Sequence, residues 1–267
     1  MNFLLLLNEA SPWVVALGLV AIAEIYSIGL MLLCRSRLGA DRLARNNEVA
    51  GFKFAVIGVF YAVLLAFVVV AVWENYRDTE TAVRNEAKAL VDLHQSSYAL
   101  PEEVGDAMRK RLISYTEQVR DLEWPAMAKG LSSGSAANEL HNLGKTILLA
   151  KAEQLKDVAL YHHVLDLLTT VNDNRSERLD SSDGTVPNVL WLVLVAGGLI
   201  TLGYPSFFGT SNITAQILMT AALAALVALT ALVAVVLDYP FTGQVRISRA
   251  PIEQSLHQMP PQKWPPP

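Results

Sequence analysis

The chain has 267 residues, of which 52% are hydrophobic, and its formal net charge is −4. Together with a positive mean hydropathy, this composition excludes an ordinary soluble domain and predicts an integral membrane protein. The only cysteine is Cys34, which excludes an intrachain disulfide and a cysteine-based zinc site within one chain. The amino terminus, "MNFLLLLNEASPW", lacks the basic flank and small-residue cleavage site of a secretory signal, so we expect it to remain in the mature protein.

Four apolar runs are long enough to cross a bilayer. A helix needs about 20 apolar residues to cross about 30 Å of hydrocarbon, and the runs that meet this length are Trp13 to Cys34, Phe54 to Trp73, Val189 to Phe208 and Ile213 to Leu237. We therefore predict an all-α integral membrane protein with four transmembrane helices, the lipid bilayer being one of its partners.

Glu24 is the only charged residue within these runs. A carboxylate near the middle of a span is costly and normally faces a protein interior or water, so Glu24 is a candidate functional residue. The alternative is that it is protonated or bonded to a neighbouring span, for instance through Tyr26, Ser27 or Tyr61.

The first hairpin, residues 1–76, contains a basic linker at residues 35–53. This linker carries five Lys or Arg residues against two acidic ones, whereas the first twelve residues and the connection from Gly209 to Asn212 carry no Lys or Arg. Basic short loops stay in the cytoplasm, which places both termini and the long middle segment outside. This orientation is an expectation from charge alone.

The second run has neither glycine nor proline from Val59 to Leu100, which predicts one helix that continues beyond the membrane. At about 1.5 Å per residue it would be ~63 Å long. Val59, Val63 and Phe67 are spaced four apart and share one stripe of this helix. They would form stacked apolar rings if several copies surrounded an axis; otherwise the stripe faces lipid or neighbouring helices.

Residues 77–186 read as a helical soluble domain. Between Glu74 and Pro187 there are 19 Asp and Glu against 13 Lys and Arg, and apolar residues recur at helical spacing. One helix runs from after Pro101 to before Pro125, with Leu122 on its apolar stripe. A longer one covers Leu140 to Val171 and includes Leu155. The segment "KGLSSGSAAN" between them predicts a loop.

The second hairpin covers residues 187–238 and is followed by a tail, 239–267. Pro187 suits a helix start. The proline-rich end of the tail, "HQMPPQKWPPP", is predicted to be disordered or polyproline-like.

Enzyme motifs are absent from the sequence: there is no phosphate-binding glycine loop, no nucleophile elbow and no zinc-hydrolase helix signature. His162 and Asp166 lie one helical turn apart, but a metal would need more ligands, so a surface pair is expected. We predict no catalytic residues, no metal and no cofactor. Nucleic acid is not an expected partner, because no basic patch carries interleaved aromatic residues.

Several motifs carry a family resemblance. The order Gly58, Val59, Val63, Phe67 resembles the neck-forming helix of bestrophin channels, and "LDYPFTG" resembles the segment after their last membrane helix. Nearly the whole chain is similar to a bacterial family labelled bestrophin-like, on the motifs "NNEVAGFKFAVIGVFYAVLLAFVVVAVWE", "EWP", "RSERL", "PNVLW" and "DYPFTG".

The resemblance implies an ion channel of the bacterial inner membrane, formed as a homopentamer. Val59, Val63 and Phe67 would then be a hydrophobic neck that gates small monovalent ions by dewetting. Tyr61, Trp73 and Glu74 become further candidate functional residues on the same helix. An acidic soluble segment on the ion path would favour cations.

Two departures from the bestrophin pattern limit the transfer. The acidic calcium-binding run of animal bestrophins is replaced here by "QVRISRAP", which predicts no calcium site. Bestrophins hold their soluble region in the cytoplasm, whereas the basic linker here argues for the outside. The alternative function is a non-conducting membrane sensor or scaffold whose helical domain binds a ligand or partner protein.

Overall fold

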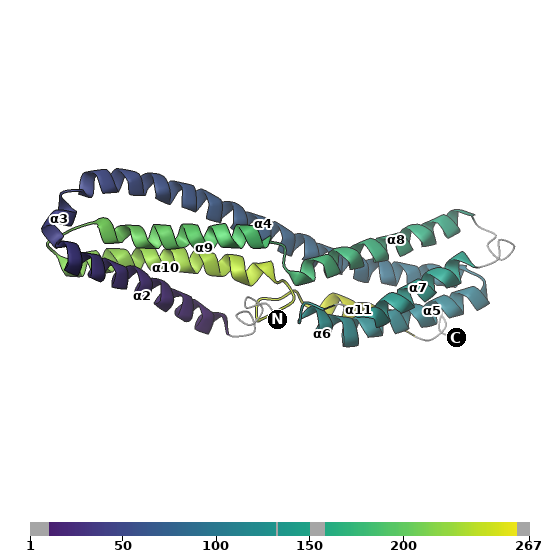
Figure 1. Ribbon diagram of the computed structural model, residues 1–267. Coiled ribbons are helices and arrows are strands. Elements are labelled where there is room, and N and C mark those ends of the chain that lie inside the picture. The colour runs from purple at the N-terminus through teal and green to yellow at the C-terminus, as the bar shows by residue number, and fades with distance from the viewer. Residues whose placement is uncertain (1–10, 132, 150–157, 261–267) are drawn as a thin grey trace. The chain divides into compact units, whose positions relative to one another are not determined.

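The computed structural model describes residues 11–131, 133–149 and 158–260, and these residues form helices joined by turns, without a strand (Figure 1). Four of the helices are long and apolar enough to cross a membrane. The predicted all-α fold with four candidate spans is therefore confirmed. The predictions for the amino-terminal residues 1–10, for Leu155 and for residues 261–267 lie outside the described residues. The start of the predicted disordered end is wrong, because His257 and Gln258 belong to the helix α11 (Ala250–Gln258) and Met259 is buried against the core.

The chain divides into two compact units, which are described separately. The membrane unit comprises Met1–Asn75, Thr185–Tyr239 and Gly243–Val245, and the insert unit comprises Tyr76–Gly184, Pro240–Thr242 and Arg246–Pro267. The helix α4 contributes to both units, because it is continuous from Asn47 to Ser96. The prediction that the second span continues as helix into the next segment is confirmed.

The membrane unit contains the four candidate spans and two short helices at their connections. Its elements are α2 (Pro12–Leu38), α3 (Ala40–Ala44), the first part of α4, α9 (Asn188–Gly203), the 3-10 helix η5 (Tyr204–Phe207) and α10 (Ile213–Asp238). Gly39 ends α2 with a positive φ of 80°, which only glycine adopts freely. The basic linker is thus largely helical, since α3 and the start of α4 lie within it.

Small residues pack α2 against α10. Ala23, Ala224 and Ala228 are buried in one cluster with Leu202, and small side chains let helix backbones approach closely within a membrane. The Ser27 hydroxyl donates a 2.6 Å hydrogen bond to the Leu202 carbonyl, so even this polar side chain is satisfied inside the bundle.

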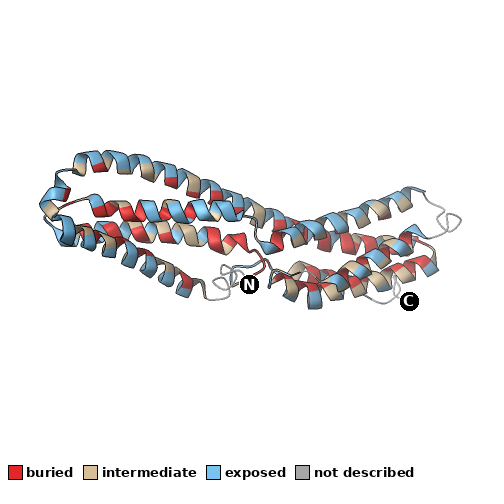
Figure 2. Ribbon diagram, viewed as in Figure 1, coloured by how far each residue is buried: buried red, intermediate tan, exposed pale blue. Residues whose placement is uncertain are grey.

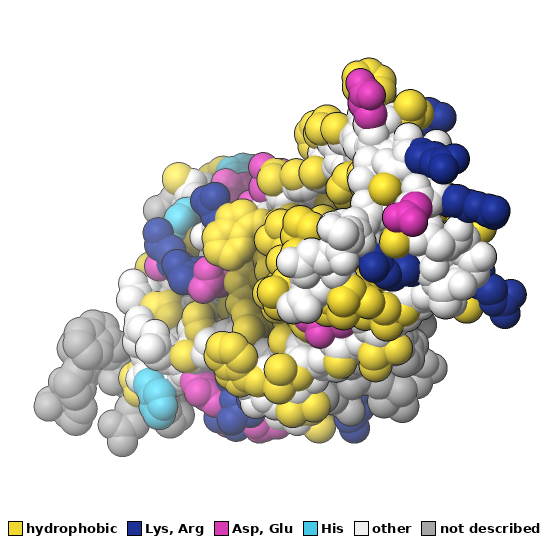
Figure 3. Space-filling model, turned by 90° about the vertical axis from the view of Figure 1, so that its left-hand side faces the viewer, with side chains coloured by type: hydrophobic (Ala, Val, Ile, Leu, Met, Phe, Trp, Pro, Cys, Tyr) yellow, Lys and Arg dark blue, Asp and Glu magenta, His cyan; other side chains and the backbone are white. Residues whose placement is uncertain are grey.

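The connection between η5 and α10 is tied to the linker between α2 and α4. The Asn47 amide donates to the Gly209 carbonyl at 2.7 Å and its oxygen accepts the Gly209 N–H at 3.0 Å. Arg35 donates to the Thr210 carbonyl at 2.7 Å and to Gln216 at 3.0 Å. Figure 3 shows Lys and Arg side chains gathered along one edge of the face at this end of the unit.

The insert unit is a second helical bundle. Its elements are the rest of α4, the 3-10 helix η1 (Ser97–Ala99), α5 (Glu102–Gln118), the π-helix η2 (Val119–Glu123), α6 (Trp124–Met127), α7 (Gly134–Leu148), α8 (Val158–Asp180), the 3-10 helix η4 (Ser181–Asp183) and α11 (Ala250–Gln258). Leu90, Leu93, Met108, Leu112 and Leu143 are among its fully buried core residues. Figure 2 draws buried residues in red.

Three details of the predicted helices are wrong. The chain remains helical through Pro125, which lies in the first turn of α6 directly after the π-helix η2, where the hydrogen-bond pattern of the helix changes. Leu122 is exposed, because the π-helix that precedes α6 shifts the helical phase. The stripe from Leu140 to Val171 belongs to two helices, α7 and α8.

Candidate functional site

The predicted neck residues lie on the exposed side of α4. The exposed fractions of Val59, Val63 and Phe67 are 63%, 49% and 70%. The opposite side of the same helix packs on the chain itself through a buried stripe of Tyr61, Leu65, Val68 and Val72. The stripe that resembles a bestrophin neck is therefore free of contacts that would hold it inside the subunit.

Tyr61 has a packing role within the membrane unit. A Cβ at Gly197 would lie 2.9 Å from the Tyr61 ring, and one at Gly198 would lie 3.0 Å from its hydroxyl oxygen. The two glycines of α9 therefore provide the space that the Tyr61 ring occupies. This close packing accounts for the tyrosine at position 61 without assigning it a role in ion conduction.

Glu24 is partly buried on α2 and forms no hydrogen bond or ion pair with another described residue. The partners suggested by sequence are engaged elsewhere, since Tyr26 donates to the Leu199 carbonyl and Ser27 to the Leu202 carbonyl. Trp73 and Glu74 are both exposed on α4. The structure does not bring these candidates together with Glu24 into one described hydrogen-bonded site.

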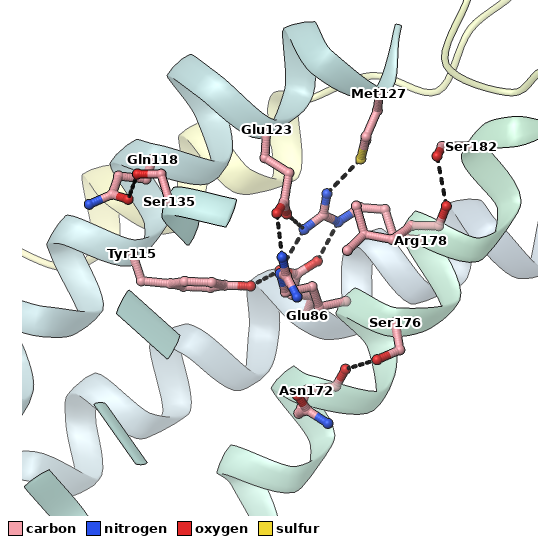
Figure 4. Close-up of polar contacts among 12 residues, drawn as sticks. Glu86, Tyr115, Gln118, Glu123, Met127, Ser135, Asn172, Ser176, Arg178 and Ser182 are labelled. Atoms are coloured by element: carbon pink, nitrogen blue, oxygen red, sulfur yellow. Dashed lines mark hydrogen bonds and ion pairs between the residues drawn. The ribbon is translucent and has the colours of Figure 1, made fainter. Parts of the chain in front are cut away.

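The insert unit contains a cluster of charged side chains, most of them fully buried (Figure 4). Arg178 on α8 is fully buried and donates from Nε to Glu86 Oε2 at 2.7 Å and from Nη2 to Glu86 Oε1 at 3.1 Å. The same Nη2 donates to Glu123 Oε1 at 2.7 Å. Both carboxylates are also fully buried. One guanidinium thus joins α4 to the π-helix.

Two further residues complete this buried charge cluster. The Tyr115 hydroxyl donates a 2.6 Å hydrogen bond to Glu86 Oε1, and Arg175 donates to Glu123 Oε2 at 2.5 Å. Burial raises the pKa of Tyr115 well above its ordinary value, and the charge of Glu86 raises it further. The phenol therefore stays protonated and keeps donating to Glu86.

The cluster balances its charges, with two arginines against two glutamates. Buried ions are tolerated when they are paired and hydrogen-bonded, although such pairs often contribute little net stability. Their geometry is specific, because a displaced partner leaves an uncompensated charge in the core. The cluster therefore fixes how α8, the π-helix and α4 pack within the insert unit.

The short motifs of the sequence meet in pairs. Glu123 of "EWP" bonds both arginines of "RSERL", and Trp124 of "EWP" packs edge-on against Phe241 of "DYPFTG", with ring centroids 5.4 Å apart. In the membrane unit, the indole of Trp191 in "PNVLW" donates to Asp238 at 3.3 Å. Sequence reasoning noted these motifs but missed their contacts.

No group of three His, Cys, Asp or Glu residues within the described ranges is placed to hold a metal ion. His162 and Asp166, the pair considered from sequence, are both exposed on α8. The described charged residues that do cluster, around Arg178, are paired with one another, although Nε of Arg175 has no hydrogen-bond partner.

The fold and the candidate site define an α-helical membrane protein with four candidate spans, whose long second span has one face packed on the chain and one apolar face exposed. A family model described as Bestrophin-like domain matches residues 21–252. The chain therefore belongs to the Bestrophin-like family, as the motifs predicted.

Solved structures share the fold. Three crystal structures of a bacterial bestrophin homologue from Klebsiella pneumoniae, two of them with one substituted residue, superpose with TM-scores of 0.68, 0.68 and 0.69 at 12%, 14% and 15% identity. In each comparison 91% of this chain is covered, with 97%, 96% and 97% of the other chain. Among curated proteins, no match was found.

Proposed function

We propose that the protein is an ion channel of the bacterial inner membrane, formed by five copies around one axis with α4 lining the pore. Val59, Val63 and Phe67 from each copy form the neck, which gates small monovalent ions. Membership of the Bestrophin-like family and the shared fold support this function. The basic linker is cytoplasmic by its charge, so the insert unit lies on the opposite, outer side of the membrane.

The observation that carries the proposal is the two-sided character of α4. A span that served only as an anchor would be free to expose any apolar face, but here the exposed face of α4 is the one that carries the neck motif. Rings of valine and phenylalanine form a dry constriction when several copies surround an axis, and such constrictions gate by dewetting.

Glu74 adds a charge to the same side of the helix. It follows Val63 by 11 residues, which is about three turns and ~16.5 Å along the axis, and its side chain is exposed. In the proposed assembly it forms an acidic ring after the neck. Such a ring favours cations over anions at that entrance.

Ion flux from vesicles tests the function. The purified protein in liposomes should conduct, and Val63→Ser should raise the flux, because a polar ring wets the neck. Val233→Ser on α10 is the matched control, since Val233 is also an exposed apolar residue of a candidate span. The absence of any flux across a wide range of pH and voltage, in both the parent protein and Val63→Ser, would refute the channel.

A non-conducting sensor or scaffold is the second candidate, and one observation favours it. A recess of about 470 Å³ lies between α4 and α11 in the insert unit. It is lined by charged and amide side chains that suit a polar ligand: Arg84, Lys88, Asp92, Gln95, Gln254 and Gln258. For a scaffold, Val63→Ser leaves the vesicles as tight as the control does.

A further inference from the structure

A cavity of about 200 Å³ lies inside the membrane unit, with walls from α2, α4, α9 and α10. Small residues leave this space open where larger side chains would fill it, namely Ala23, Gly198, Ala228, Ala231 and Ala234. Several lining residues, including Leu65 and Leu194, are buried. The cavity therefore reaches from the surface of the four spans into their packed interior.

The exposed lining residues show where the cavity opens. Ile22 and Tyr26 on α2 and Val195 and Leu199 on α9 line the cavity and are exposed. The Tyr26 hydroxyl donates to the Leu199 carbonyl at 3.2 Å, linking the two helices there. The mouth thus lies between α2 and α9, and the neighbouring outer surface is apolar, with Leu17, Ile25 and Leu192 exposed.

Polar partners for water are scarce in this cavity. An ordered buried water needs two to four polar partners, and apolar cavities stay dry and take up apolar molecules. The hydroxyl of Tyr26 is engaged by Leu199, and the indole of Trp191 donates to Asp238. Among the described lining groups, only the Tyr61 hydroxyl has no hydrogen-bond partner. One hydroxyl does not hold a water in place.

We propose that this cavity binds one acyl chain of a bilayer phospholipid, which enters between α2 and α9. The walls carry no charged side chain, so they suit hydrocarbon and do not suit a headgroup or a polar ligand. The mouth faces the medium around the candidate spans, and at that depth of a membrane the medium is lipid tail. The proposal requires only that the four helices cross a bilayer, and it does not depend on conduction.

The bound chain would contact the helix proposed to line the pore. Tyr61 and Leu65, which form part of the cavity wall, belong to the side of α4 opposite Val63. A lipid tail in the cavity therefore supports the back of α4, while its exposed stripe faces away from the subunit.

Photolabelling of the full-length protein in vesicles tests the site. The probe is a phosphatidylglycerol with a diazirine near the middle of one acyl chain, and the labelled residues are mapped by mass spectrometry. We expect label on the buried lining residues Leu65, Leu194 and Ala228. Ala231→Phe puts a ring into the cavity and should abolish that label, whereas Ala222→Phe, on the exposed side of α10, should leave it unchanged.

Three outcomes would overturn the proposal. Label confined to exposed side chains such as Leu226 shows that the lipid binds only at the surface. Label on Leu65 that persists in Ala231→Phe shows that the probe reaches Leu65 without occupying the cavity. A photoreactive side chain placed at Ile22, which is exposed at the mouth, that crosslinks to a second copy shows that protein covers the cavity. If Ala231→Phe fails to fold, Val195→Trp blocks the mouth by changing only an exposed side chain, and it must likewise remove the label.

Discussion

Replacing Arg178 with methionine removes the cation that two buried carboxylates share. Glu86 accepts three hydrogen bonds, two from Arg178 and one from Tyr115, so the substitution leaves it with one. Glu123 loses one bond and keeps its bond to Arg175. Glu86 is therefore the group that becomes an uncompensated charge in the core of the insert unit.

The expected cost follows from this count. Removing one partner of a buried ion pair costs about 3–5 kcal/mol, and at about 2–4 °C per kcal/mol the melting temperature should fall by roughly 6–20 °C. The tryptophan fluorescence of the detergent-solubilised protein reports the loss, because the Arg178 guanidinium lies 5.7 Å from the Trp124 ring.

A matched control separates burial from charge. Arg84→Met removes an arginine whose ion pair with Glu80 is largely exposed, and such surface pairs contribute about 0.2–0.5 kcal/mol. Adding Glu86→Gln to Arg178→Met should recover part of the lost stability, since the stranded charge is removed. A loss of 1 kcal/mol lowers the melting temperature by about 2–4 °C. If the melting temperature of Arg178→Met lies within about 2 °C of that of Arg84→Met, the cluster does not constrain the core as described.

Tyr115→Phe should lower the free energy of unfolding at neutral pH by about 1.5–3 kcal/mol, because a bond to the charged Glu86 is lost. Since the pKa of Tyr115 is raised above the unfolded value of about 10, its contribution is complete below about pH 10 and declines as the pH rises further. Urea unfolding at several pH values should show a shallower alkaline decline in Tyr115→Phe, and equal slopes would contradict the reasoning. Gly209→Ala would place a Cβ 2.3 Å from a backbone oxygen of α3, and should destabilise by about 1–3 kcal/mol. Gly58→Ala meets no atom within 4 Å, so equal melting temperatures for these two variants would refute the clash.

Sequence periodicity predicted which faces are buried but not what covers them. The four spans follow from uninterrupted apolar runs, and the length of α4 follows from the absence of glycine and proline. The contact between Glu86 and Arg178 joins residues 92 positions apart, and no local pattern encodes such a pairing. The arginines at positions 175 and 178 gave a partial signal, since three-residue spacing places them on one face of a helix.

The candidate site was predictable to a similar extent. The stripe of Val59, Val63 and Phe67 is a feature of one helix, so spacing alone identified it. The packing of Tyr61 on Gly197 and Gly198 depends on a second helix far along the chain, and so does the cavity beside it. Small residues in α9 and α10 looked like ordinary span composition, because the space they leave exists only once the helices are packed.

The burial pattern along α4 gives the most direct argument about its surroundings. Its inner stripe is buried at alternating intervals of four and three residues from Tyr61 to Val72 and again from Thr79 to Leu93, and is half-buried at Asn75 and Tyr76 between them. The helix therefore packs on its own chain in a similar way in both parts. Its outer face changes from valine and phenylalanine before Trp73 to Glu74, Arg77, Arg84 and Lys88 beyond it. A helix surrounded by one medium along its whole length would not be expected to change the composition of its outer face while its inner face stays packed. The outer face has the composition expected of a helix that leaves a bilayer near Glu74, and its apolar part is the surface that lipid or neighbouring copies must cover.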